Sequence, residues 1–268
     1  MVLNIFRNDA RKNMSFFLIW CAVFIGFIFM YLPMTNLILD EMDELVIFIE
    51  KMPKFLLNVF NIEPEVFSKP EGIFGSEGMS FIYILSAVFA ANLAGAVFSK
   101  EFEEKTIEYL LVKPVRRSTV FFEKTLLMLT LITILSFLFT FFELWGFQLF
   151  INRAYSEKIL LSFGVYLFCV LVFFGGLSSF ISCMTKKSTL NISISIGIIV
   201  FMYFGELLGR NYKGIFWLSR ISIFYYIPLI DTIVNETMYL ANAIMISLIG
   251  LLFFVAGFAV FNKSDIGT

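Results

Sequence analysis

SKEFEEKTIEYLLVKPVRRSTVFFEK, residues 99–124, is the most densely charged part of the sequence, and a long apolar run lies on each side of it. Its acids alternate with lysines and its apolar residues recur at helical offsets, which predicts a short amphipathic helix. Pro114 ends this helix because the residue before a proline is disfavoured in helical backbone. A helix this short and charged does not cross a membrane. We interpret it as a docking element rather than a plain connector.

The composition of the whole chain predicts a polytopic membrane protein. Of its 268 residues 59% are hydrophobic and only 15% are charged, whereas soluble domains are about 25% charged. A crossing helix needs roughly 20 apolar residues. Six stretches qualify, and they are residues 15–32, 79–98, 119–142, 159–184, 190–208 and 239–261.

The segments that flank these spans have distinct patterns. Residues 1–14 predict an amphipathic helix in the membrane surface, with Arg7, Arg11 and Lys12 near anionic headgroups. Residues 35–78 form a long outer segment with an acidic helix at its start. Glu123 and Lys124 fall in the first turns of the third span, where we expect them to face the interface, with the lysine amine extended to water.

The distribution of cations predicts the orientation of the chain. With the N-terminus in the cytoplasm, the short inner segments hold twelve of the 20 lysines and arginines. The outer segments are longer and hold the other eight. Six spans with both termini inside are therefore favoured, and the charged segment (residues 99–118) then faces the cytoplasm. The net charge of −1 offers no basic field for nucleic acid.

Several classes of catalytic and metal site are excluded. The chain has no histidine, which removes histidine-based triads and two-histidine zinc helices. Its three cysteines, Cys21, Cys169 and Cys183, lie apart in apolar runs, as packing residues do. No phosphate-binding Gly-x-x-x-x-Gly-Lys-Ser/Thr motif occurs. We predict no catalytic residue, metal or cofactor in this chain, and if ATP drives its function, another polypeptide binds the ATP and magnesium.

Small and polar residues within the spans are further candidates. Span two has a small residue every fourth position, which permits close helix packing either within the chain or at a seam between subunits. These seam residues are Ala87, Ala91, Gly95 and Ser99. Polar groups at membrane depth are functional candidates, and we place Glu143, Asn92 and Asn191 on a candidate cargo path. Glu206 precedes Arg210 by four residues, so an ion pair on one helix face explains it.

The stretch from Glu101 to Lys124 resembles the cytoplasmic motif of ABC type-2 exporter permeases. In that family an acidic helix ends in Thr-x-Glu-x-Leu-Leu, and a Pro-Val-x-Arg turn and a lysine follow. The matching residues here are Thr106, Glu108, Leu110, Leu111, Pro114, Val115, Arg117 and Lys124. The chain departs from the family at Lys105, where glycine is frequent, so the helix continues where relatives bend.

The resemblance implies a non-catalytic permease subunit in a bacterial plasma membrane. It would pair with a second permease subunit, identical or different, and bind an ATP-binding cassette subunit that powers export. The cargo would be a peptide, a drug, a lipid-like molecule or an ion. The residues expected to contact the ATPase are Glu101, Phe102, Glu104, Thr106, Ile107, Glu108, Leu110, Leu111, Pro114, Arg117 and Lys124.

Two alternatives stay open. One is a structural or signalling membrane protein whose charged segment recruits a partner without ATPase activity. The other is an intramembrane hydrolase, for which Glu143 and Glu206 make a poor catalytic pair.

Overall fold

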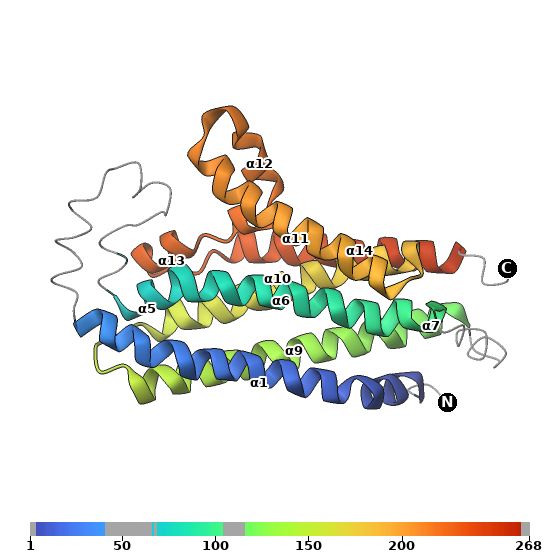
Figure 1. Cartoon of the computed structure of the whole chain (residues 1–268), viewed down its shortest axis with the longest axis horizontal. Helices are drawn as coiled ribbons and strands as arrows, with labels where there is room; N and C mark the ends of the chain where they lie inside the picture. Colours follow the sequence, from blue (N-terminus) through green and yellow to red (C-terminus); the bar gives the residue numbers. More distant parts are fainter. Residues whose placement is uncertain (1–3, 41–65, 67–68, 104–115, 264–268) are drawn as a thin grey trace.

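The computed structural model describes residues 4–40, 66, 69–103 and 116–263, and this part of the chain is helical without any strand. Six of its helical stretches are long and apolar enough to cross a membrane, which confirms the predicted six-span, all-α architecture (Figure 1). The long helices are α1 (Asn4–Asp40), α6 (Met79–Ala94), α9 (Arg117–Phe150), α10 (Glu157–Thr185), α11 (Ser188–Asn211) and α14 (Leu240–Lys263).

Shorter elements extend or connect these helices. The second span is one continuous stretch built from α5 (Pro70–Ile73), the π-helix η1 (Phe74–Gly78), α6, the π-helix η2 (Gly95–Ser99) and α7 (Lys100–Glu103). Between α11 and α14 the chain forms η3 (Lys213–Ile215), α12 (Phe216–Ile221), η4 (Ile223–Tyr226) and α13 (Leu229–Asn235).

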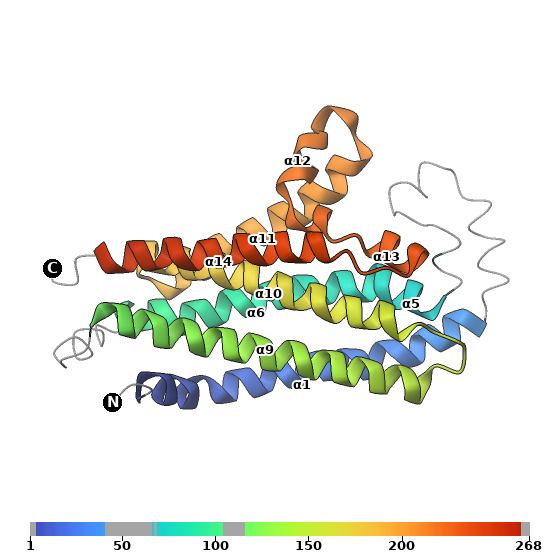
Figure 2. The same cartoon turned by 180° about the vertical axis from the view of Figure 1, so that it is seen from behind.

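Helix α10 is the core of the bundle: α6, α9, α11 and α14 pack against it, and α1 packs mainly against α9 (Figures 1 and 2). Glycines allow its close approach to α14. A Cβ on Gly176 would overlap the carbonyl oxygen of Gly250, and a Cβ on Gly250 would lie 2.7 Å from the Phe173 Cα. In lipid, small residues at a crossing drive packing because backbones can approach closely.

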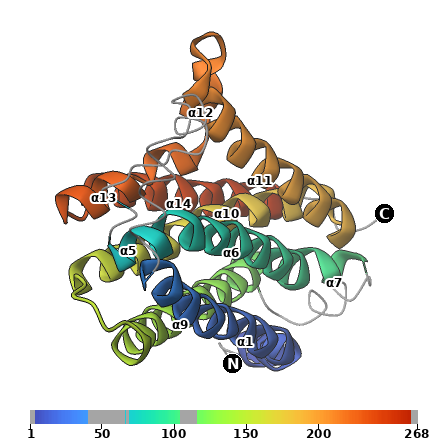
Figure 3. The same ribbon diagram turned by 60° about the vertical axis from the view of Figure 1, so that its left-hand side comes forward.

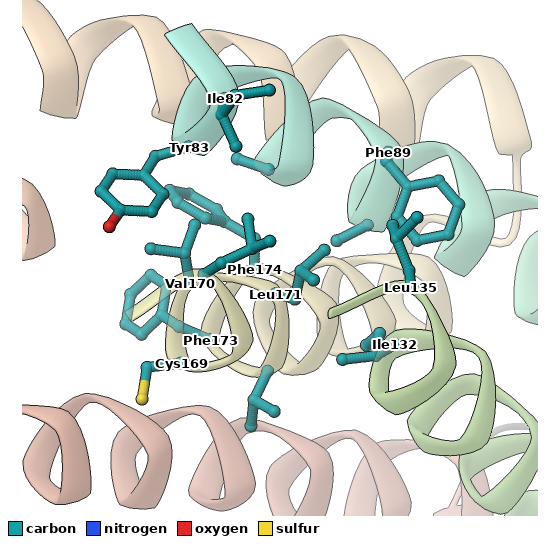
Figure 4. Packing of buried hydrophobic residues seen from close by; sticks show 14 of the residues in the cluster. Ile82, Tyr83, Phe89, Ile132, Leu135, Cys169, Val170, Leu171, Phe173 and Phe174 are labelled. Carbon is teal, nitrogen blue, oxygen red and sulfur yellow. The ribbon is translucent and has the colours of Figure 1, made fainter. Parts of the chain in front are cut away.

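The centre of the bundle is filled by aromatic and branched side chains from three helices (Figure 4). Phe89 of α6 and Leu135 of α9 meet on one side of α10, and Tyr83 of α6 lies further along it. Phe173 and Phe174 pack edge to face with their ring centroids 5.1 Å apart. This core fixes α6, α9 and α10 relative to one another.

Both ends of the described chain lie at one end of the bundle. The start of α1, the end of α14 and α7 are found there, while α5 and α13 lie at the opposite end (Figure 1). We call the first the inner end and the second the outer end. An even number of spans places the two termini on the same side.

The helices extend beyond the ranges expected from hydropathy. Residues 4–14 are the first turns of α1 and not a separate helix, because no Gly or Pro interrupts the run into the first span. Helix α1 also continues past Pro33 to Asp40, and the second span begins at Pro70. Both ends of the expected outer segment 35–78 are therefore parts of long helices, and residues 41–65 lie outside the described residues.

Helix α11 leaves the bundle at an angle, and α12 projects from its side (Figure 3). The turn between them is tight, since a Cβ on Gly209 would lie 2.6 Å from the Ser219 backbone nitrogen. Glu206 and Arg210 form the predicted ion pair on α11, which is confirmed. The guanidinium of Arg210 also lies 5.4 Å from the Tyr225 ring centroid.

Candidate functional site

A buried lysine joins three elements at the inner end of the bundle. The Nζ atom of Lys124 on α9 lies 3.0 Å from Oδ2 of Asp9 on α1 and 2.8 Å from Oε2 of Glu101 on α7. It also donates to the carbonyl oxygen of Val97, 2.6 Å away. Lys124 is 1% exposed. We call Lys124, Asp9 and Glu101 the Lys124 cluster.

The expected position of Lys124 at the water interface is wrong. A lysine at the end of a span extends its amine to water when nothing covers it, but here the first turns of α1 and α7 supply carboxylates that enclose the amine. The ammonium group donates hydrogen bonds to Asp9 and to the Val97 carbonyl oxygen, and it forms an ion pair with Glu101. Removing one member of such a cluster leaves an uncompensated buried charge, which costs more than the pairing gains.

The neighbouring residue fastens the start of α1. The carboxylate of Glu123 accepts hydrogen bonds from the backbone nitrogens of Ile5 at 3.1 Å and Phe6 at 3.0 Å. These nitrogens belong to the first turn of a helix, where no carbonyl is available to them and where a negative charge is favoured. Glu123 is also buried, against the expectation that it faces the interface. Adjacent residues of α9 therefore hold α1 by a cap and by an ion pair.

A hollow of about 280 Å³ opens beside the Lys124 cluster. Its lining residues are Asp9, Lys12, Asn13, Ala96, Lys100 and Glu101. Two lysines face two carboxylates around it, so its lining carries no net charge. Among the described residues, no group of three His, Cys, Asp or Glu side chains could hold a metal ion.

The first residues of the charged segment contact the inner ends of other helices. The ring of Phe102 packs edge to face on Phe261 of α14, with centroids 5.8 Å apart, and Lys186 Nζ lies 5.9 Å from its centroid. Glu103 accepts a hydrogen bond from the backbone nitrogen of Ser188, the first residue of α11, at 3.1 Å.

The residues predicted to contact an ATPase thus fall into two groups. Glu101 and Lys124 are paired with each other inside the chain, Phe102 is partly covered, and Arg117 begins α9. The rest lie outside the described residues, and they are Glu104, Thr106, Ile107, Glu108, Leu110, Leu111 and Pro114. Glu101, Phe102 and Lys124 therefore make contacts within the chain, and contact between the described members and an ATPase stays a prediction.

The π-helical turn η2 directly precedes α7 in the chain, and side chains of neighbouring helices form hydrogen bonds with backbone groups in and next to it. Lys124 takes the Val97 carbonyl, and Ser182 of α10 donates to the carbonyl oxygen of Ala94 at 3.2 Å. Asn191 of α11 fits best with its amide oxygen accepting from the Gly95 backbone nitrogen at 3.2 Å and its nitrogen donating to the carbonyl oxygen of Ser178 at 2.9 Å. Side chains from three helices thus satisfy the backbone around a π turn, a feature that is frequent at functional sites.

The small residues of span two lie inside the chain. Ala87, Ala91, Gly95 and Ser99 are all buried. A Cβ on Gly95 would lie 3.0 Å from Ser188 Oγ, and the hydroxyls of Ser99 and Ser182 are 2.6 Å apart. Packing within the chain accounts for the burial of these residues, and their part in a seam between subunits stays a prediction.

The three candidates for a cargo path are spread along the bundle. Asn191 is at the inner end beside η2, and Asn92 donates to the Val88 carbonyl of its own helix at 2.8 Å. Glu143 is fully buried in the outer half of α9, and neither of its carboxylate oxygens has a hydrogen-bond partner among the described residues. The structure does not bring these side chains together.

Sequence reasoning missed Asp9, Glu103 and Ser182. Asp9 is the one acid among the cations of residues 1–14, and an acid in an otherwise basic stretch is a signal for a specific cationic partner. Ser182 and Glu103 gave no such signal, because their partners are backbone or hydroxyl groups more than 80 residues away.

The chain was compared with known proteins. A sequence model of the family described as "ABC-2 family transporter protein" matches residues 3–266, nearly the whole chain. Comparisons with curated proteins and with solved structures found no match.

Proposed function

The chain belongs to the family of ABC-2 transporter proteins, and from this membership we propose that it is the permease subunit of an ATP-binding cassette exporter. It is a multi-pass membrane protein of a family whose members are generally non-catalytic transmembrane subunits. In the proposal, ATP is hydrolysed by a separate subunit beneath the membrane. The cations at the inner end favour a cytoplasmic location for both termini in a bacterial plasma membrane.

The observation that carries the proposal is the anchoring of the charged segment at its start. The Lys124 cluster fixes α7 to α1 and α9, and Phe102 and Glu103 fix it to α14 and α11. A force applied to the charged segment would therefore reach four spans through buried or short contacts. Packed elements with such contacts move as rigid bodies when a partner closes.

The proposed docking face is the remainder of the segment. Its acids, Glu104 and Glu108, would pair with cations on the ATPase, while Ile107 and Leu110 would fill an apolar groove, as amphipathic helices do. Because Glu101 is paired with Lys124, we assign ATPase contact to residues beyond Glu103.

A second permease subunit is part of the proposal. The small residues of α6 are buried, whereas α11 and α12 stand away from the bundle and expose large apolar side chains such as Phe204 and Trp217. We assign the contact with the second subunit to this side of the chain.

The test is co-purification with an ATP-binding cassette subunit from membranes in which both chains are expressed. Leu110→Asp places a charge on the proposed apolar anchor and should abolish capture of the ATPase while the permease still inserts. Lys187→Asp, at an exposed position of the neighbouring inner loop, is the matched control and should retain it. Capture that survives Leu110→Asp would contradict docking by this segment. A wild-type chain that captures only partners without vanadate-sensitive ATPase activity would favour the recruiting role instead.

A further inference from the structure

A second ionisable group is buried at the other end of α9, and its surroundings differ from those of Lys124. Glu143 is seven residues before the end of α9, which places it about 10 Å along the helix from that end. Its neighbours on α9 pack against three other elements. Phe139 contacts Phe24 of α1, Phe147 contacts Phe74 of η1, and Thr140 lies against Gly164 of α10.

The carboxyl group of Glu143 has no counter-charge. It is 0% exposed, and both oxygens lack a hydrogen-bond partner among the described residues. No ion pair of this part of the chain includes it. An ionised carboxylate in that position would be strongly disfavoured, because nothing replaces the water it has lost.

The titratable groups named on the helices packed against α9 are acids and not cations. Tyr83 of α6 lies within electrostatic range of Glu143, and Tyr166 and Cys169 of α10 lie within range of Tyr83. Tyr31 of α1 donates to the Ile73 carbonyl oxygen, 3.4 Å away, and Glu77 of η1 is exposed. None of these groups supplies a positive charge to Glu143.

A proton suits this carboxyl group better than a metal ion does. A metal cation requires several oxygen ligands around it. Among the described residues, no group of three His, Cys, Asp or Glu side chains gathers at Glu143 or elsewhere that could hold a metal ion. A proton needs only the carboxylate itself.

We propose that the carboxyl group of Glu143 is a proton-binding site in the outer half of the bundle. It carries a proton while α1, α6, α9 and α10 are packed as described, and it releases the proton where these helices separate enough to admit water. Polar groups continue from its neighbourhood toward the outer end. Tyr166 bonds the Thr232 hydroxyl at 3.0 Å, and the Tyr239 backbone nitrogen donates to Tyr166 at 3.0 Å. The proposal goes beyond the permease assignment and does not depend on an ATPase partner.

The test is infrared difference spectroscopy of the purified full chain in lipid nanodiscs at neutral pH. The carbonyl band of a protonated carboxylic acid should be lost in Glu143→Gln. It should be unchanged in Glu206→Gln, because Glu206 forms an ion pair with Arg210 that favours its carboxylate form. The Gln side chain keeps the shape of a neutral acid, so thermal unfolding of Glu143→Gln should match that of the wild type and show that the variant folds.

Three results would overturn the proposal. The first is an acid band that persists unchanged in Glu143→Gln. The second is a carboxylate band, rather than an acid band, that disappears in this variant. The third is an infrared signal of Glu143 that changes when choline replaces sodium in the buffer, which would assign the site to a metal cation. Labelling of Glu143 by a hydrophobic carbodiimide that falls as the pH is raised would support the proposal independently.

Discussion

Replacing Lys124 by methionine should separate the inner ends of the spans. Methionine keeps the length of the side chain but removes the ammonium group. The carboxylates of Asp9 and Glu101, which are 3% and 7% exposed, would then face each other without a cation. The Val97 carbonyl oxygen would lose its donor at 2.6 Å as well.

The expected loss of stability is large. Breaking a buried ion pair from one side costs about 3–5 kcal/mol, because the partner charge stays buried. For a chain of this size, 1 kcal/mol corresponds to a shift in Tm of roughly 2–4 °C, so Tm should fall by roughly 6–20 °C. Lys158→Met is the control. Lys158 is exposed at the start of α10, and such a surface substitution stays within about 0.5 kcal/mol.

The buried cysteines of the chain can report its thermal unfolding. Cys21, Cys169 and Cys183 are all free and buried, so a thiol-reactive fluorophore becomes bright only when the helices separate. The unfolding curve of the detergent-purified protein then gives Tm directly.

A compensated variant distinguishes charge from packing. If unpaired carboxylates cause the loss, adding Asp9→Asn and Glu101→Gln to Lys124→Met should recover most of it, since the three residues interact directly. A Tm that Lys124→Met leaves unchanged, or a triple variant less stable than the single one, would refute the account of the Lys124 cluster.

Two further predictions concern helix packing. Gly176→Ala should destabilise the chain by about 1–3 kcal/mol, because the new methyl group overlaps the Gly250 carbonyl. Gly197→Ala is the control and should stabilise the chain by about 0.5–1 kcal/mol, because nothing lies within 4 Å of the added methyl group. Thermal unfolding measures both variants, and equal shifts in Tm would contradict the close approach of α10 and α14. Phe204→Cys on α11 should form a disulfide-linked dimer in oxidised membranes, while Leu252→Cys, which is also exposed, on α14, should not. Non-reducing gels distinguish the two, and cross-linking through Leu252→Cys alone would move the subunit contact to α14.

The sequence was sufficient for the six spans and for pairs within one helix. The apolar runs are long enough to identify every crossing, and the Glu206–Arg210 pair could be predicted because its spacing places both residues on one face. Helix ends were less predictable from hydropathy, because hydropathy does not show that α1 continues through Pro33 or that the second span continues through two π-helical turns.

The Lys124 cluster at the inner end could not be predicted from local sequence patterns. Lys124 and Asp9 are 115 residues apart, and nothing near either residue indicates the other. The small-residue stripe of α6 was ambiguous for the same reason. Its spacing shows that another helix comes close, but only the packed structure shows that this helix belongs to the same chain.

Lys124 and Glu143, two of the three buried ionisable groups of α9, should respond differently to loss of their titratable groups. Lys124 is charged and matched by two carboxylates, so a neutral substitute of similar length leaves buried charge unbalanced. Glu143 has no counter-charge in the part of the chain that the structure describes, so its neutral isostere glutamine should leave the folded state intact. Lys124→Met should therefore lower Tm far more than Glu143→Gln, although Glu143 is the more deeply enclosed in apolar surroundings. If Glu143→Gln lowered Tm more than Lys124→Met, the Glu143 carboxyl group would have to be ionised and paired. The distinction between the ion-paired Lys124 cluster at the inner end and a protonated carboxyl group at the outer end would then fail.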